Sequence, residues 1–210
     1  MPAVLREPQQ SRSLATRERL LDGTARSLCE VGLAGTSTAA IAARAGVSQG
    51  AVFKHFATKA DLLGHAVAHM LADMVATFRA DIGAAVADAG GDPIRAACVV
   101  LWRIFRQPSM RAVFEIYVAA RTDDALAARL APILDGHRAA ILIEARRLFP
   151  EVAAPSADLD DAVDAVVYAM QGATLGLFAP GPEAGDEHLA FLERLARREL
   201  ARVARGPQGA

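Results

Sequence analysis

The sequence has little of the chemistry that metal and redox proteins use. Its 210 residues include only two cysteines, Cys29 and Cys98, which lie far apart. Neither has a companion Cys or His at the spacing of metal ligands, so the pattern indicates neither a zinc site nor a disulfide framework. We expect two buried, reduced thiols, no bound cofactor and no metal.

Long apolar runs are also missing. No charged N-terminal segment is followed by an apolar run and a small-residue cleavage site, and no uninterrupted apolar stretch reaches the length that spans a membrane. The hydrophobic fraction of 53% and the net charge of -1 are those of a folded protein rather than a disordered one. These features predict a cytoplasmic protein.

Lysine is scarce, and only Lys54 and Lys59 are present. Residues 1–65 hold eight Lys and Arg against five Asp and Glu, whereas residues 66–210 hold 15 against 19. Two nearby lysines on their own are more typical of a solvated helix face. Their place in the basic front of the chain, within the motif described below, raises the alternative of a contact with nucleic acid.

Strand patterns are absent, and apolar residues instead recur at helical spacing. Capping residues mark the helix starts, as in Thr58 with Asp61 three residues later, and Gly or Pro marks the ends. The sequence therefore predicts an all-α protein with disordered ends at 1–12 and 206–210. About nine helices are expected, over residues 14–32, 37–46, 49–55, 59–86, 92–107, 109–122, 125–149, 158–179 and 186–205.

The stretch "GVSQG", residues 46–50, fits two different motifs. As G-x-S-x-G it matches the nucleophile elbow of α/β-hydrolases, with Ser48 as the nucleophile. That elbow needs a β-strand before the serine, but the preceding "STAAIAARA" favours a helix. We interpret the match as accidental and predict no catalytic residue.

The same stretch fits the turn and the second helix of a helix-turn-helix. Val47 is the apolar residue that such a turn buries between its helices. At about 100° per residue, Val52 and Phe56 face inward, with Phe53 at their edge. The opposite face is small and basic, and consists of Gly50, Ala51, Lys54 and His55.

The segment "GLAGTSTAAIAARAGVSQGAVFKHFATKADLL", residues 32–63, closely resembles the DNA-binding segment of TetR/AcrR-type transcriptional regulators. The specific motif covers about residues 14–63 and includes T, I-A, A-G-V-S, an aromatic residue and F-x-x-K-x-x-L. The resemblance implies an N-terminal three-helix helix-turn-helix domain over residues 13–57. It also implies a C-terminal helical ligand-binding and dimerisation domain over residues 58–205.

The resemblance assigns roles to residues of this motif. Hydroxyls and amides at the start of the second helix are expected to hold a phosphate, as is the lysine at the start of the fourth. Residues at the start of the third helix are expected to meet base edges. The DNA-binding set is Ser37, Thr38, Ser48, Gln49, Gly50, Ala51, Phe53, Lys54, His55 and Lys59.

Two departures from the family pattern affect base recognition. Phe53 replaces the usual tyrosine and lacks its hydroxyl, and Ala39 stands where some members have a base-reading arginine. Direct base contacts are therefore expected to be sparse and to be supplemented by DNA shape.

The rest of the chain predicts an effector site and a dimer. Although only 5% of residues are aromatic, several aromatic, apolar and polar residues gather in a few helices, as in a ligand cavity. These are Met74, Phe78, Trp102, Phe105, Phe114, Tyr117, Tyr168, Gln171 and Thr174. The segments 158–179 and 186–205, apolar on more than one face, resemble half of the family's four-helix dimer interface.

The sequence thus predicts a ligand-responsive transcriptional regulator and not an enzyme. It would repress by binding double-stranded, palindromic operator DNA as a homodimer, and a small apolar or aromatic effector would release it. The alternative is a helical-bundle enzyme or metal-binding protein that uses His65 and His69, which with Asp73 recur every four residues. Because these residues lie opposite the apolar arc of their helix, a solvated face is the favoured interpretation.

Overall fold

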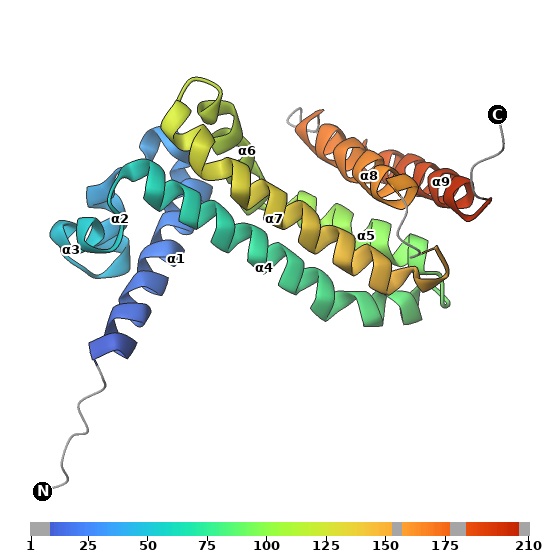
Figure 1. Ribbon diagram of the computed structural model, residues 1–210, viewed down its shortest axis with the longest axis horizontal. Coiled ribbons are helices and arrows are strands. Elements are labelled where there is room, and N and C mark those ends of the chain that lie inside the picture. The colour runs from blue at the N-terminus through green and yellow to red at the C-terminus, as the bar shows by residue number, and fades with distance from the viewer. Residues whose placement is uncertain (1–8, 153–156, 177–183, 206–210) are drawn as a thin grey trace, which may run out of the picture. The chain divides into compact units, whose positions relative to one another are not determined.

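The computed structural model describes residues 9–152, 157–176 and 184–205. Within these residues the chain forms nine α-helices, one short 3-10 helix and no strand (Figure 1). The predicted all-α fold is confirmed. The helices are α1 (Gln9–Gly35), α2 (Thr38–Ala45), α3 (Gln49–His55), α4 (Lys59–Asp88), α5 (Pro93–Phe105), α6 (Pro108–Ala120), α7 (Asp124–Leu148), η1 (Pro150–Val152), α8 (Ala157–Gly176) and α9 (Ala184–Arg205).

The first helix is longer than the sequence pattern predicts. It begins at Gln9, so residues 9–12 of the expected disordered arm are helical, because no Gly or Pro interrupts the chain between Pro8 and Gly23. Residues 1–8 and 206–210 lie outside the described residues. Near its other end the helix breaks at Gly32, where φ is 68° and ψ is -179°. The predicted stop at this glycine is confirmed as a kink, after which helical backbone continues to Gly35.

The chain folds into two compact units. Unit 1 consists of residues 1–71 and 108–135, and unit 2 of residues 72–107 and 136–210. Unit 1 therefore contains α1, α2, α3 and α6, unit 2 contains α5, η1, α8 and α9, and α4 and α7 contribute to both. The functional boundary expected at residue 58 stays a prediction.

The core of unit 1 holds the helix-turn-helix against α1. Leu20 and Leu28 of α1, Ile41 of α2, and Val52 and Phe56 at α3 are each at most 2% exposed. Burial of five such side chains favours the fold by several kcal/mol, at about 1.5–3 kcal/mol each. Packing of these side chains, rather than intrinsic propensity, stabilises helices as short as α2 and α3.

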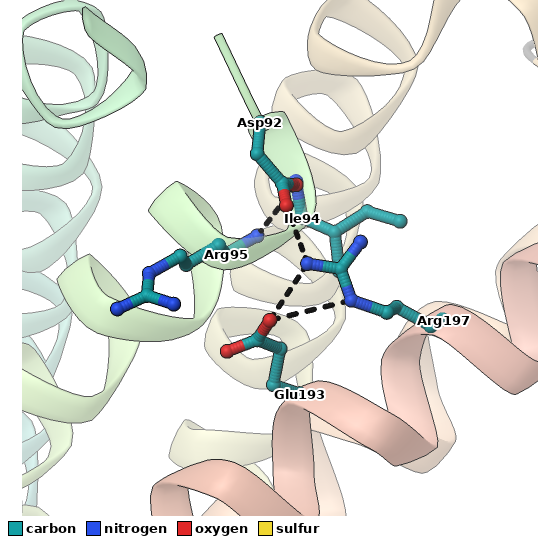
Figure 2. Close-up of polar contacts among 5 residues, drawn as sticks. All are labelled: Asp92, Ile94, Arg95, Glu193 and Arg197. Carbon is teal, nitrogen blue, oxygen red and sulfur yellow. Dashed lines mark hydrogen bonds and ion pairs between the residues drawn. The ribbon is translucent and has the colours of Figure 1, made fainter. Parts of the chain in front are cut away.

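In unit 2, α5 contacts both α8 and α9, and α8 packs against α9 (Figure 1). Asp92 caps α5, because its carboxylate accepts hydrogen bonds from the N–H groups of Ile94 and Arg95, both at 3.1 Å. Figure 2 shows that Arg197 of α9 reaches the same carboxylate and also pairs with Glu193 at 2.6 Å. The hydrogen bond from Arg197, followed by that from Arg95, lowers the pKa of Asp92.

The two cysteines differ in exposure. Cys98 on α5 is buried, and desolvation raises the pKa of its thiol to about 12. Cys29 on α1 is exposed, so the prediction that both thiols are buried is wrong for Cys29. Successive helix residues point about 100° apart, and in this turn Leu28, at 2% exposure, takes the inward position.

Candidate nucleic-acid interface

A tight turn joins α2 to α3. Gly46 ends α2 in the left-handed region, with φ 65° and ψ 37°. The N–H of Val47 donates to the carbonyl of Ala42 at 3.0 Å, and the N–H of Gly46 donates to that of Ala43 at 3.2 Å. This is a Schellman motif, which favours glycine because a β-carbon is strained at positive φ. Val47, predicted to be buried in this turn, is half-buried.

The two faces of α3 are separated as the sequence predicts. Val52 and Phe56 are each 1% exposed and fix the helix to unit 1. On the opposite face Gln49, Gly50 and Lys54 are exposed. Ala51 and His55 are half-buried, and Phe53 is 52% exposed.

The exposed face of α3 can approach another surface closely. A β-carbon added at Gly50 would have only the Ser48 hydroxyl within 4.0 Å. Lys54 and His55 lie in the last turn of the helix, and Lys59 is the exposed first residue of α4. A small, cationic face of this kind suits a polyanion whose backbone and base edges must be reached together.

The hydroxyls at the helix starts have different roles. Ser37 caps α2, because its hydroxyl oxygen accepts a hydrogen bond from the N–H of Ala40 at 3.1 Å. Ser48 occupies the corresponding N-cap place before α3 but makes no side-chain capping bond. The hydroxyl of Thr38 accepts a bond from the Gln49 amide at 3.2 Å. Thr38 therefore orients the side chain that is predicted to read bases, a contact between residues 11 apart that helical spacing does not reveal.

The start of α4 has the capping box that the sequence predicts. The Asp61 N–H donates to the Thr58 hydroxyl at 3.0 Å, and the Asp61 carboxylate accepts from the N–H of Ala57 at 3.2 Å. Asp61 is 8% exposed, and its carboxylate pairs with Arg129 of α7 at 2.7 Å. These bonds fix the backbone at Lys59, whose side chain is the exposed cation of this turn.

Arg17 of α1 is a basic residue that the sequence pattern does not single out. Its guanidinium lies over the Phe56 ring, 5.0 Å from the centroid, and so places a further cation beside the end of α3. The sequence signal is weak, because Arg17 is one of three arginines in the first part of α1 and only the packing of α1 against α3 distinguishes it.

The structure places the predicted effector residues in both units. In unit 2, Met74, Phe78, Trp102 and Phe105 are at most 9% exposed, whereas Tyr168 is 61% exposed. Gln171 and Thr174 are half-buried, and the Thr174 hydroxyl donates to carbonyls of its own helix.

In unit 1, Phe114 is buried and meets the ring of Tyr117 edge-on at 6.2 Å. Desolvation raises the pKa of Tyr117 to about 12, so the phenol remains a neutral hydrogen-bond donor over the physiological range. A neutral phenol among apolar groups suits an uncharged ligand.

A groove of about 290 Å³ lies between α4 and α5 within unit 2. Alanines and valines form its floor, Asp81 and Asp88 flank it from α4, and Arg95 and Arg103 flank it from α5. None of the nine predicted effector residues lines this groove. The predicted effector set thus stays a prediction.

The face of His65, His69 and Asp73 is solvated only in part, because Asp73 is exposed whereas both histidines are half-buried and have partners within unit 1. The Nδ1 atom of His65 lies 3.4 Å from the Asp61 carboxylate, and its ring packs against Phe56 at 5.4 Å. The Nε2 atom of His69 lies 2.9 Å from the carboxylate of Asp22 on α1. Both histidines join α4 to the rest of unit 1. Among the described residues, no three or more of His, Cys, Asp and Glu are grouped so as to hold a metal ion.

A tight Schellman turn, a second helix with a small and cationic outer face, and a third helix behind them define the class of helix-turn-helix DNA-binding proteins. The family model described as "Bacterial regulatory proteins, tetR family" matches residues 20–66. An HTH-type transcriptional regulator of Mycobacterium tuberculosis strain H37Rv is 32% identical over 189 residues, which are 89% of this chain and 95% of the relative. The BetI regulator of Burkholderia thailandensis is 43% identical over 58 residues, 28% of this chain and 30% of BetI.

Solved structures agree in fold. A TetR-family transcriptional regulator from Mesorhizobium loti has a TM-score of 0.69 and 17% identity, with 91% of this chain and 98% of that chain covered. The multidrug binding protein EbrR, complexed with imidazole, has a TM-score of 0.60 and 24% identity, with 85% and 93% covered. The chain belongs to the TetR family of HTH-type transcriptional regulators, which bind DNA and small-molecule effectors and are not enzymes.

The helices of the described part of the chain are too short or too polar to cross a bilayer. None combines the length with the apolar character that a membrane span requires.

Proposed function

We propose that this protein is a ligand-responsive repressor that binds a palindromic operator as a homodimer and is released by a small apolar or aromatic effector. The observation that carries the proposal is the outer face of α3, where exposed Gln49 and Lys54 flank Gly50. A face without bulk lets the helix backbone enter the major groove, where an amide can pair with adenine and a lysine with guanine.

The remaining proposed DNA contacts surround this face. Ser37 and Thr38 at the start of α2, and Lys59 at the start of α4, hold backbone phosphates and set the register of α3. Ser48, Ala51, Phe53 and His55 complete the proposed contact surface. Because Phe53 is 52% exposed and has no hydroxyl, it contacts sugar or thymine methyl groups rather than a phosphate.

The exposed surface of α8 and α9 supports the proposed homodimer through residues 158–179 and 186–205. Tyr168 and Phe191 are 61% and 56% exposed, and Leu175 is 40% exposed. Large apolar side chains exposed on adjacent helices mark an interaction surface. Residues 177–179 lie outside the described residues. Two-fold symmetry would place two copies of α3 about 34–36 Å apart, one turn of DNA.

The proposed effector class rests on the buried aromatic residues and on one structural neighbour. EbrR, described as a multidrug binding protein, has been crystallised with ethidium and with proflavin, both aromatic compounds. Trp102 and Phe105 of α5, both within unit 2, supply aromatic surface for such a ligand in this chain.

The DNA part is tested by selecting duplexes from a random library with the wild-type protein and measuring the affinity of the selected site by fluorescence anisotropy. Gln49→Ala should lower the affinity for the selected site about 10- to 100-fold, since one bidentate base contact is worth about 1–3 kcal/mol. Affinity for unrelated duplexes should be almost unchanged. Failure to select any palindromic site would reject the operator proposal.

The effector part is tested with Trp102, which is the only tryptophan of the chain. Apolar and aromatic compounds are screened in parallel for quenching of its fluorescence and for release of the selected duplex. Compounds that release DNA should quench Trp102, and Phe105→Leu in the same unit should weaken both effects together. Release without quenching, and without any effect of Phe105→Leu, would place the effector elsewhere.

A further inference from the structure

The corner between α1 and α2 is held by a residue from a distant part of the sequence. Glu115 of α6 accepts a hydrogen bond from the N–H of Leu33, with its Oε2 atom at 2.7 Å. The two residues lie 82 positions apart, and α1 and α6 pack against each other within unit 1. Leu33 directly follows the kink at Gly32, so the carboxylate acts as a cap supplied by another helix.

Gly32 is favoured here by its backbone conformation, and the end of the Glu115 side chain lies close to it. Its φ of 68° is unfavourable for any residue with a β-carbon. A β-carbon at Gly32 would also lie 2.9 Å from Oε2 and 3.2 Å from Oε1 of Glu115. The Glu115 carboxylate therefore lies in direct contact with the backbone of the kink.

A chain of buried hydrogen bonds leads from the kink toward α2. The Thr36 hydroxyl donates to the carbonyl of Gly32 at 2.7 Å and lies 3.1 Å from the hydroxyl of Ser27. Ser27 is 0% and Thr36 is 2% exposed. Buried hydroxyls that lose their partners are costly, so this corner has one well-satisfied arrangement.

The same chain segment continues to the recognition helix. Ser37, directly after Thr36, caps α2, and Thr38 holds the Gln49 side chain at 3.2 Å. A shift at Gly32 and Leu33 therefore moves the start of α2 and, through Thr38, the residue that is proposed to read bases.

We propose that Glu115 is a positioning residue: its carboxylate fixes the α1–α2 corner and thereby sets the orientation of Gln49 and α3 without touching DNA. This inference rests on the proposed DNA-binding function. A carboxylate repels DNA phosphates. If removal of Glu115 weakens DNA binding, the loss therefore does not come from a lost phosphate contact.

The test compares Glu115→Ala with Asp124→Ala in the full-length protein. Asp124 is an exposed carboxylate of α7 in the same unit, and its removal changes the net charge equally. Affinity for the duplex selected by the wild type is measured across a range of salt concentrations. Glu115→Ala should bind about tenfold more weakly with an unchanged salt slope, whereas Asp124→Ala should bind as the wild type or slightly more tightly.

Amide hydrogen exchange gives a second readout that does not depend on DNA. Exchange in residues 32–38 should be about tenfold faster in Glu115→Ala than in the wild type, and unchanged in Asp124→Ala. Glu115→Gln, which keeps an oxygen acceptor of the same shape, should restore most of the protection and most of the affinity. It also serves as the folded comparison if Glu115→Ala melts at a much lower temperature.

The outcomes separate this inference from the proposed function. If the wild type selects no duplex but Glu115→Ala still accelerates exchange at 32–38, the corner contact stands and the DNA function fails. If Glu115→Ala exchanges and binds like the wild type, the inference is overturned while the DNA function stands. The inference is also overturned if Glu115→Ala shows wild-type amide exchange at residues 32–38 but binds DNA more weakly. The loss of affinity would then not arise from the α1–α2 corner.

Discussion

The recognition segment of unit 1 and the α8–α9 pair of unit 2 expose opposite kinds of side chain. On α3 the outer face has Gly50 with open space around it and the cation of Lys54. On α8 and α9 the exposed side chains include large apolar ones among arginines, with Tyr168 at 61% and Phe191 at 56% exposure. A small cationic face suits a hydrated polyanion, whereas a large apolar one suits a protein partner that removes it from water.

The two regions also differ in how their exposed faces are held. The α3 face comes from seven consecutive residues, and local turn geometry at Gly46 sets its direction. The α8–α9 surface depends on two separate helices, and Arg197 fixes α9 to the start of α5 through Asp92 (Figure 2). A single substitution on α3 should therefore weaken DNA binding. The dimer should be weakened by a charge introduced on its apolar surface or by the loss of a contact that holds α9 in place.

The largest expected effect is on assembly. Phe191→Asp places a charge where the proposed dimer buries an aromatic ring, and because of two-fold symmetry each dimer receives two such charges. The dimer dissociation constant should rise at least about 100-fold, which sedimentation velocity would detect as a monomer at micromolar concentration. Val118→Asp, at a 68% exposed apolar residue of α6, is the matched control and should leave the mass unchanged. Equal behaviour of the two variants would remove α9 from the interface.

The next effect separates DNA affinity from stability. Gly50→Ala adds a methyl group that meets nothing in the protein closer than 4.0 Å, and it should stabilise α3 by up to about 0.5–1 kcal/mol. If the helix backbone must approach DNA closely, operator affinity should nevertheless fall about tenfold. Gly83→Ala in α4, also with open space around it, should raise the melting temperature without affecting DNA binding. Unchanged affinity of Gly50→Ala would mean that α3 is not in close contact with the duplex.

A smaller effect is expected at the phosphate contacts. Lys59→Ala should weaken binding to all duplexes similarly and reduce the slope of log affinity against log salt by about one per subunit contact. Arg121→Ala removes the same charge from an exposed residue elsewhere in unit 1 and should leave the slope unchanged. Equal slopes for Lys59→Ala and the wild type would exclude a contact between Lys59 and a phosphate.

The smallest effect concerns the attachment of α9. Arg197 and the N–H of Arg95 lower the pKa of Asp92 below its ordinary value of 3.8 in the folded state. A lowered pKa contributes stability that is present above the unfolded pKa and is lost as the pH falls toward the folded one. The melting temperature of the wild type should therefore drop more between pH 5 and pH 3 than that of Arg197→Ala, by about a few degrees.

The control for this pH effect lies one residue further along the helix. Arg198 pairs with its neighbour Glu199 at 3.3 Å, does not share the carboxylate of Asp92, and has a side chain that is 74% exposed. Arg198→Ala should therefore keep the wild-type pH dependence. If Arg197→Ala behaves in the same way, the bond to Asp92 contributes nothing measurable in solution.

The sequence by itself determined the helices and the two faces of α3. Val52 and Phe56 are buried and Gly50 and Lys54 exposed because the period of a helix is fixed by its backbone hydrogen bonds. The turn at Gly46 and the caps at Ser37 and Asp92 likewise follow from bonds between residues at most five apart. Such features can be predicted from a short stretch of chain, and the motif of residues 14–63 is made of them.

Only the tertiary structure decided the contacts that join distant segments. The bond from Leu33 to Glu115, the bond from Gln49 to Thr38 and the pair of Arg197 with Asp92 link residues whose separation no helical period encodes. The same holds for the exposure of Cys29 and for the pairing of His69 with Asp22. Which helices meet depends on the sum of many weak packing contacts across the whole chain, and each polar pair forms only where that packing brings its two partners within reach.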